Sequence, residues 1–403
     1  MRRLPPVARR FTGTFTQQDA LPAEAIAAAV AVLQSGRLHR YNLAADEVGE
    51  VAHLEAEYRD WQGCDYCLAV TSGGQALQIA LRACGVSAGD PVLTNGFTLA
   101  PVPGAIRAVG GQPVLVEIDQ NLRLDPQDLQ TRIESSGAKV LLLSHMRGHL
   151  CDMDRVMQIC DRAGVTVIED CAHTMGAGWA GRRSGNFGKV ACFSTQTYKH
   201  MNSGEGGFLT TNDAGVAARA TILSGSYMLY DRHGAGPDPQ AFDQARYEMP
   251  NCSARMDAVR AAILRPQLAH LEENIARWNA RYAVVERGLQ AHNLIATIDL
   301  PSQESHVGSS IQFRLPEFSA AQCRGVIAAA AQRGVELKWF GAPEPAGFTS
   351  SHQSWRYVTA QELPQTDRIM ATLFDMRLPF RFSEADCALI AELIGEAVME
   401  VAA

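Results

Sequence analysis

Two acidic residues and a lysine stand at the ends of apolar runs in the middle of the chain. Lys199 follows the run 190–193, and Glu169 and Asp170 end the run 165–168 about thirty residues earlier. A lysine amine becomes a nucleophile toward carbonyl groups when burial or a nearby cation lowers its pKa. A carboxylate beside it can hold a protonated ring nitrogen. The pair therefore predicts chemistry on a cofactor that carries an aldehyde and a basic ring.

The setting of Lys199 favours this role over that of a solvated surface lysine. An apolar run precedes it, small and polar residues flank it, and Gly204-Glu205-Gly206-Gly207 follows within a few residues. Glycines allow the backbone to approach a reactive group closely. We interpret Lys199 as the Schiff-base lysine.

Asp170 is the acid that we expect beside the ring nitrogen. Alternation along a strand turns neighbouring side chains to opposite sides, so Glu169 would point away from it. The competing interpretation of Asp170 is a helix N-cap. His173, three residues later, would lie near the same ring, although an isolated histidine is more often structural.

A candidate phosphate site lies much earlier in the chain. Ser72-Gly73-Gly74-Gln75 joins an apolar run to a helical pattern, where free N–H groups and the helix dipole attract an anion. Ser194 would add a hydroxyl, and Phe97 would cover one face of the ring, with a core aromatic as the alternative. An aldehyde, a basic ring and a phosphate together indicate pyridoxal 5'-phosphate. The predicted cofactor-binding residues are Ser72, Gly73, Gly74, Gln75, Phe97, Asp170, His173, Ser194 and Lys199.

The elements that must position these residues are short buried strands. Continuous apolar runs alternate with helical patterns such as 74–81, which is typical of an α/β fold with a mostly parallel sheet covered on both faces. Ligands bind at the carboxyl ends of such strands, where the candidate residues fall. The expected strands are 67–71, 91–94, 113–116, 140–144, 165–168, 190–193 and 207–211.

A second, smaller α+β domain is expected after residue 255. A long helical pattern begins near Met256, strand-like alternation follows at 310–315 and 335–339, and helices are expected at 320–332 and 384–401. We therefore expect a large domain over residues 1–255, including an N-terminal helical segment, and a small domain over 256–403.

Composition excludes several classes of protein. The chain of 403 residues is 47% hydrophobic and 20% charged, with a net charge of −7, so nothing favours binding to nucleic acid or an anionic membrane. No apolar signal segment follows the basic start, and Ala23–Leu33 is too short to span a bilayer. The ten cysteines fit reduced core thiols, Cys64 and Cys67 included, so we expect a cytoplasmic protein without a metal site.

Taken together, the motifs resemble those of the DegT/DnrJ/StrS sugar aminotransferases, a family of fold type I pyridoxal phosphate enzymes. The resemblance runs from about Tyr41 to Val401. The similar segments are 70–77 (the phosphate turn), Glu169-Asp170-Cys171-Ala172-His173, Phe193-Ser194 with Lys199, Glu205-Gly206-Gly207, and Asn251 before Ser253-Ala254-Arg255-Met256.

The resemblance implies a fold like that of aspartate aminotransferase, a three-layer large domain with a small C-terminal domain. It also implies a transaminase that takes an amino group from glutamate, glutamine or another amino acid and gives it to a keto sugar, keto cyclitol or related carbonyl compound. It further implies a homodimer with shared active sites, in which Asn251 reaches the cofactor phosphate of the partner. In a family variant the lysine is replaced by histidine; here the spacing to Ser194 and Glu205 selects Lys199 over His200.

Three departures concern the substrate. Gly74 replaces the usual threonine or serine, Arg147 in the turn 145–148 stands where an aromatic residue is common, and the segment 339–357 lacks the histidine-proline pattern of nucleotide-sugar members. An arginine offers a planar fork to an anionic group. The candidates for the substrate are Arg147, Arg232, Arg356 and Arg377, of which Arg147 and Arg356 are our choices, with a preference for Arg356.

Two other functions stay open at this point. The same cofactor could support elimination, replacement or carbon–carbon bond formation on an amino acid, because the pocket selects the reaction. The second possibility is a non-catalytic binding or regulatory protein with this fold, since one fold hosts many functions.

Overall fold

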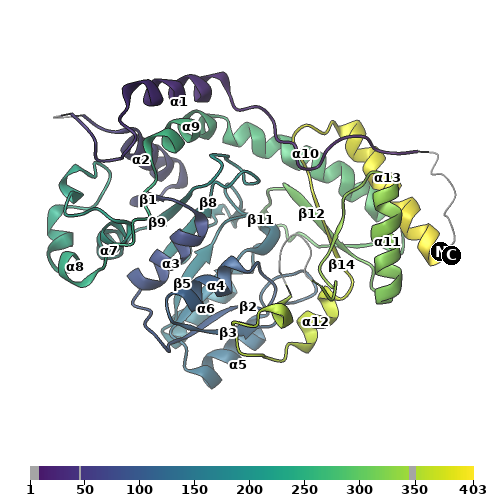
Figure 1. The fold of residues 1–403 in the computed structure, drawn as a ribbon. Helices are drawn as coiled ribbons and strands as arrows, with labels where there is room; N and C mark the ends of the chain where they lie inside the picture. Colours follow the sequence, from purple (N-terminus) through teal and green to yellow (C-terminus); the bar gives the residue numbers. More distant parts are fainter. Residues whose placement is uncertain (1–8, 45–46, 345–350) are drawn as a thin grey trace.

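The computed structural model describes residues 9–44, 47–344 and 351–403. A seven-stranded sheet with helices on both faces forms the larger part, and a four-stranded antiparallel sheet with its own helices forms the smaller part (Figure 1). The predicted α/β class with a mostly parallel sheet and a smaller α+β unit is confirmed. Among the described residues, no helix has both the length and the apolar character needed to cross a membrane.

The large sheet is parallel except for one strand. Its order is β1 (Tyr66–Val70), β9 (Gly207–Thr211), β8 (Val190–Ser194), β5 (Thr166–Asp170), β4 (Val140–Ser144), β2 (Pro91–Asn95) and β3 (Gln112–Val116). Strand β9 runs antiparallel to both of its neighbours, and all other neighbouring pairs are parallel. The seven predicted strands match these to within two residues at each end, because continuous apolar runs are what a doubly covered sheet requires.

Helices cover both faces of this sheet and make three layers. Alternate side chains of one strand enter different cores: Leu68 and Val70 pack on one face, and Cys67 and Ala69 on the other. The first face is covered by α3 (Gly73–Ala83), α4 (Pro101–Ala108) and α7 (Ala214–Ser224), and the second by α2 (Glu50–Gln62), α5 (Pro126–Ser136), α6 (Met153–Ala163) and α9 (Ala258–Ala269).

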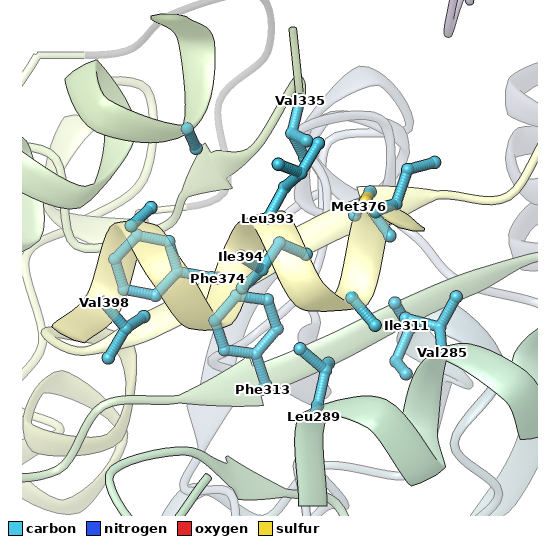
Figure 2. Packing of buried hydrophobic residues seen from close by; sticks show 14 of the residues in the cluster. Val285, Leu289, Ile311, Phe313, Val335, Phe374, Met376, Leu393, Ile394 and Val398 are labelled. Carbon is cyan, nitrogen blue, oxygen red and sulfur yellow. The ribbon is translucent and has the colours of Figure 1, made fainter. Parts of the chain in front are cut away.

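The small sheet is amphipathic. Its order is β10 (Ala296–Thr297), β12 (Ser310–Arg314), β14 (Leu373–Arg377) and β13 (Lys338–Trp339). Figure 2 shows Ile311, Phe313, Phe374 and Met376 of the central strands packed against residues of α10 (Leu271–Gln290) and α13 (Glu384–Ala402). The rings of Phe313 and Phe374 stack with centroids 5.4 Å apart. Alternation therefore turns the intervening polar residues away from this core.

The structure corrects three details of the predicted elements. The expected strand 335–339 is reduced to Lys338–Trp339, and the long helical pattern divides at His270 into α9 and α10. Strand β14 was not expected, because Asp375 and Arg377 interrupt its apolar residues. The other regular elements are α1 (Ala23–Ser35), α8 (Phe242–Glu248), α11 (Ala320–Gln332), α12 (Pro364–Met370), β6 (Gly178–Trp179), β7 (Arg182–Arg183) and β11 (Glu304–Ser305).

Packing crosses the expected domain boundary in both directions. Phe11 and Phe15 of the N-terminal segment pack with Phe382 in the core of the small domain, with ring centroids 4.9 Å from that of Phe382. Helix α9 packs under the large sheet instead, although it follows residue 255. A boundary at 255/256 therefore stays a prediction.

Candidate active site

Lys199 lies in the turn after β8 and is the centre of the site. Its pKa is lowered to about 7, first by burial and then by the positive charge of Arg147, while Asp170 opposes the shift and Arg377 adds to it. These effects place Asp170, Arg147 and Arg377 within electrostatic reach of the amine. A substantial fraction of this amine is neutral near pH 7, as a nucleophile requires.

Asp170 ends β5 on the side of Lys199. Its Oδ2 accepts a hydrogen bond from the Ser144 hydroxyl (2.9 Å), and its Oδ1 accepts from the Ala172 N–H (3.1 Å). Burial raises the pKa of this carboxyl, and the Ala172 N–H and the Lys199 charge act against the rise. Ser144, which accepts from Thr98 (2.8 Å), is a site residue that the sequence analysis missed. Its signal was a polar residue at the end of an apolar strand.

Glu169 turns to the other side of the strand, as alternation predicted. Its carboxylate accepts from the backbone N–H groups of Gly185, Phe187 and Gly188 at 2.7–2.9 Å, and His145 Nε2 lies 3.1 Å away. The ligand atoms of His145, Glu169 and Cys171 lie within 4.8 Å of one another. Hydrogen bonds to both oxygens of Glu169 account for this buried carboxylate, whose role is to hold the loop 185–188.

The phosphate turn, β8 and β9 meet at the N-terminus of α3. Ser72 caps the helix, with its Oγ accepting from the Gln75 N–H (3.1 Å). A Cβ placed on Gly73 would lie 2.9 Å from Ser194 Cβ, and one on Gly207 would lie 2.6 Å from the Gly73 nitrogen. The close approach brings the Ser194 hydroxyl next to the first N–H groups of α3, and such groups at a helix start attract an anion.

Gly74 is not crowded in the same way. The nearest atom to a Cβ at this position would be Ser72 Oγ at 3.8 Å. The position therefore tolerates the threonine or serine that the resemblance led us to expect. Gly74 contributes its N–H at the first turn of the helix without a steric need for glycine.

His173 and Arg147 line the same side of the site. The Arg147 N–H donates to His173 Nδ1 (3.2 Å), and Arg147 adopts a left-handed conformation with φ 59°. Burial lowers the pKa of His173 well below its usual range, and Lys199, Arg147, His200 and Arg377 lower it further. His173 is thus kept neutral in a positively charged environment.

Phe97 is packed inside a hydrophobic cluster. Its ring is 0% exposed and packs edge-on against Phe340, with centroids 5.0 Å apart, in a cluster that includes Met146 and Leu373. A ring without accessible surface cannot stack on a ligand in this conformation. Burial between the large and small domains favours the alternative of a core aromatic, and stacking on the cofactor ring stays a prediction.

The remaining candidates lie elsewhere. Arg356 is exposed and lines a separate cavity with Phe340, Glu344 and Asp367, and residues 345–350 of that segment are outside the described residues. Arg232 ends a short 3-10 turn. Asn251 is exposed, and its Oδ1 accepts from the N–H of Ser253 (3.0 Å) in a loop beside Gly225.

The residues present fit pyridoxal phosphate. Lys199, with its lowered pKa, lies near the buried Asp170. Gly73, where a Cβ would contact Ser194 too closely, lies next to Ser72 at the start of α3. These are the three groups that an aldehyde, a basic ring nitrogen and a phosphate would need. All of them lie at carboxyl ends of strands of one sheet, as expected for an α/β ligand site.

Several known proteins are similar to this chain in sequence. An L-glutamine:2-deoxy-scyllo-inosose aminotransferase of Micromonospora echinospora is 32% identical over 251 residues, covering 61% of this chain and 58% of that protein. A dTDP-3-amino-3,4,6-trideoxy-alpha-D-glucose transaminase of Streptomyces venezuelae is 34% identical over 267 residues, covering 65% and 63%. The chain thus spans about three fifths of the length of these relatives.

Solved structures share the fold over nearly the whole chain. The crystal structure of 3-amino-5-hydroxybenzoic acid synthase has a TM-score of 0.82 at 25% identity and covers 97% of this chain and 100% of that chain. DesV of S. venezuelae has a TM-score of 0.77 at 27% identity and covers 93% and 94%. A family model matches residues 20–394, which confirms the resemblance drawn from the motifs. By that match and by the site just described, the chain belongs to the DegT/DnrJ/EryC1/StrS aminotransferase family.

Proposed function

We propose that this protein is a pyridoxal phosphate-dependent aminotransferase. It would take an amino group from glutamate, glutamine or another amino acid and give it to a keto sugar, keto cyclitol or related carbonyl compound. The observation that carries the proposal is the buried Lys199 amine with a pKa of about 7, within electrostatic reach of Asp170. The names of the relatives, which act on an inosose and a deoxysugar, support this acceptor class.

Each part of the cofactor has a candidate holder in this chain. Lys199 would hold the aldehyde carbon, Asp170 the ring nitrogen, and Ser72, Gly73, Gly74, Gln75 and Ser194 the phosphate. When bound, pyridoxal phosphate supplies an electron sink that stabilises negative charge at the substrate carbon. Ser144 orients the Asp170 carboxylate through Oδ2, which keeps that carboxylate directed to the ring position.

Lys199 has a second task once the donor amine has displaced it. Its Nζ, neutral in large part near pH 7, can accept the proton from the substrate carbon and return it on the other side of the transfer. Arg147 and Arg377 keep the amine from holding that proton too tightly, since a second positive charge nearby disfavours the ammonium form. This is a ping-pong reaction, with a 2-oxo acid leaving before the carbonyl acceptor enters.

A homodimer is part of the proposal. Asn251 lies in an exposed loop, where the Tyr227 hydroxyl is 3.3 Å from Ser253 Oγ, and Tyr247 of α8 precedes Asn251 by four residues; the two tyrosines are 60% and 80% exposed. Large aromatic residues at a surface are typical of an interface. We assign this loop to the contact with a second copy, in which Asn251 completes the phosphate site of the partner.

Borohydride labelling tests the assignment of Lys199. Protein loaded with pyridoxal phosphate is reduced and digested, and the modified peptide should contain Lys199. A Lys199→Ala variant should lose the label and the visible absorption, whereas Lys189→Ala, which removes a surface lysine paired with Asp213, should keep both. Labelling of another lysine, or none, would overturn the proposal.

A half-reaction separates transamination from other reactions of this cofactor. Addition of L-glutamine or L-glutamate should bleach the bound cofactor and release one equivalent of 2-oxo acid. The colour should return when a ketone such as 2-deoxy-scyllo-inosose is added and gains the amine. Turnover of the amino acid without an aminated acceptor would instead support elimination or replacement.

A further inference from the structure

The face of the small sheet that points away from its hydrophobic core is polar. Phe374 and Met376 lie in the core shown in Figure 2, so Asp375 and Arg377 of the same strand point to the opposite side. Lys338 is the register partner of Asp375 on one side, and Gln312 is its partner on the other. Four polar residues of three adjacent strands therefore share one face.

Asp375 joins this face to the large domain. Arg147, in the turn after β4, donates from Nη2 to Asp375 Oδ2 (2.7 Å), and Gln312 donates from Nε2 to Oδ1 (2.8 Å). Gln312 Oε1 in turn lies 2.8 Å from His149 Nε2. Asp375 is 1% exposed, and each of its carboxylate oxygens accepts a hydrogen bond. The bond from Arg147 holds that guanidinium against the small sheet.

Arg377 extends the face to the reacting lysine. Its guanidinium lies 3.7 Å from the ring centroid of Tyr198, the residue before Lys199. A planar guanidinium packed on an aromatic ring keeps its edge for a carboxylate. The pKa of Lys338 falls to about 8, lowered by burial, raised by Asp375 and lowered again by Arg147 and Arg377. Arg147 and Arg377 thus act on both Lys199 and Lys338, while Asp170 acts on Lys199, and Asp375 and the exposed Glu336 act on Lys338.

A cavity opens at this face. Its volume is about 710 Å³, and Lys338, Asp375 and Arg377 contribute to its lining together with the N-terminal segment 10–13 and the residues of 334–337. Lys338 and Arg377 bring positive charge to a cavity whose carboxylate Asp375 is already bound by Arg147 and Gln312, and positive charge beside a cavity attracts a small anion. Arg377 also packs on Tyr198, next to Lys199, which itself lines a second cavity of about 370 Å³ with Thr197 and His200. An anion held at Arg377 can therefore belong to a molecule that reaches Lys199.

We propose that Arg377 and Lys338, positioned by Asp375 and Arg147, form a binding subsite for a carboxylate carried by a substrate of the reaction at Lys199. The inference rests on the proposed function, since it assigns the subsite to that reaction. The carboxylate has two sources: the amino-acid donor itself, or an acid group on the carbonyl acceptor. Arg356, our preferred arginine from the sequence, is replaced in this role by Arg377.

The experiment compares variants of the holoenzyme in two arms. The variants are Arg377→Gln, Lys338→Gln and Arg377→Lys, with Arg381→Gln as the matched control, because Arg381 is an exposed arginine four residues after Arg377. The donor arm measures bleaching rates against the concentration of L-glutamine and of L-glutaminol, which lacks the carboxylate. The acceptor arm measures calorimetric binding of D-glucuronate and of neutral D-glucose.

A carboxylate subsite predicts a selective loss. Arg377→Gln should raise the half-saturating concentration or dissociation constant of the carboxylate probe at least tenfold in one arm and that of its neutral counterpart by much less. The change in the pKa of Lys199 alters the bleaching rate of both donors alike, so only the difference in half-saturation reports on the subsite. Arg377→Lys should recover part of the loss, and Arg381→Gln should match wild type. An effect in the donor arm identifies the donor as the source, and an effect in the acceptor arm identifies the acceptor.

The subsite is refuted if Arg377→Gln and Lys338→Gln match wild type in both arms, or if wild type itself discriminates neither carboxylate from its neutral counterpart. Failure of the proposed function is distinct from this result. In that case pyridoxal phosphate binds at Lys199 but L-glutamine causes no bleaching in wild type, while the calorimetric arm still reports on the subsite.

Discussion

At the scale of single residues, the charged groups of the site shift one another's pKa values. Burial and the charges of Arg147 and Arg377 lower the pKa of Lys199, and the Asp170 carboxylate raises it. The net result is a pKa of about 7 in place of the ordinary 10.5. Asp170 is held by Ser144 and by a backbone N–H, so its carboxylate keeps its direction. With the pKa of a lysine in water, the Lys199 amine would be almost fully protonated at pH 7. Without its hydrogen bonds, the Asp170 carboxylate would rotate freely.

The pH dependence of cofactor uptake follows from this balance. The neutral amine of Lys199 is the reactive form, so the rate at which the cofactor-free protein takes up pyridoxal phosphate should rise with pH and level off above about 7. An unperturbed lysine would keep gaining reactivity up to its ordinary pKa of 10.5. Stopped-flow absorbance across the pH range measures the midpoint.

Arg377 provides the internal comparison for that experiment. Its positive charge lowers the pKa of Lys199, so Arg377→Gln should move the midpoint to higher pH. Arg381→Gln should leave the midpoint where it is in wild type. A midpoint that does not respond to Arg377 would mean that burial, Arg147 and Asp170 set the pKa of Lys199 without a contribution from Arg377.

At the scale of elements, the candidate phosphate site depends on how closely three segments approach one another. The start of α3, the end of β8 and the start of β9 meet where Gly73, Ser194 and Gly207 leave space for backbone alone. The strand order explains this meeting, because β9 lies between β1, which leads into α3, and β8. Ser72 then fixes the first turn of the helix as its N-cap.

Two adjacent glycines test this arrangement. Gly73→Ala would place a Cβ 2.9 Å from Ser194 Cβ, so we expect a loss of about 1–3 kcal/mol in stability and a weaker hold on pyridoxal phosphate. Gly74→Ala meets its nearest atom at 3.8 Å and should retain stability and cofactor affinity. Thermal melts and equilibrium dialysis against pyridoxal phosphate measure both. Equal behaviour of the two variants would show that the close approach is not what shapes the candidate phosphate site.

At the scale of the whole molecule, one surface of the described chain is unusually apolar. Helix α1 packs against α9 along one side (Figure 1), with Val32 and Ala28 against Ala258 and Ala262. Ile26, Val30 and Leu33 are nevertheless 52%, 44% and 56% exposed. At 3.6 residues per turn these three form a stripe on one side of the helix. Such a stripe supports the proposed contact with a second copy.

The double variant Ile26→Glu/Leu33→Glu tests the dimer. Burial of two such side chains is worth about 3–6 kcal/mol, so the dimer dissociation constant should rise by roughly a hundredfold or more. Cofactor affinity should fall with it, because Asn251 of one copy completes the site of the other in the proposal. Sedimentation velocity and cofactor dialysis measure the two effects.

A control on the same helix separates charge from position. Ala31 is exposed on another side of α1, so Ala31→Glu adds a carboxylate without touching the stripe. This variant should sediment as wild type does. A double variant that also sediments as wild type would place the contact between copies on some other surface.

Local patterns in the sequence predicted the strands of the large sheet, which the structure confirms, and selected the candidates Lys199, Asp170 and the phosphate turn. Those features depend on burial on both faces and on residues that are close in the chain, so apolar runs and turn residues reveal them. The same local information was insufficient for β14, where two charged residues alternate with apolar ones, and for Phe97, whose role depends on Phe340 in another domain.

Tertiary structure decided which distant groups meet Lys199. Arg147, Lys338, Asp375 and Arg377 come from two domains and are separated by up to about 230 residues, and only the packing of the small sheet against the large domain brings them together. Sequence spacing carries no signal for such a meeting: Arg147 and Arg377 were two of four candidate arginines with nothing to join them, and Lys338 and Asp375 alone resemble solvated surface charges. Local sequence motifs thus predict the cofactor chemistry, whereas long-range packing determines which groups would bind a charged substrate.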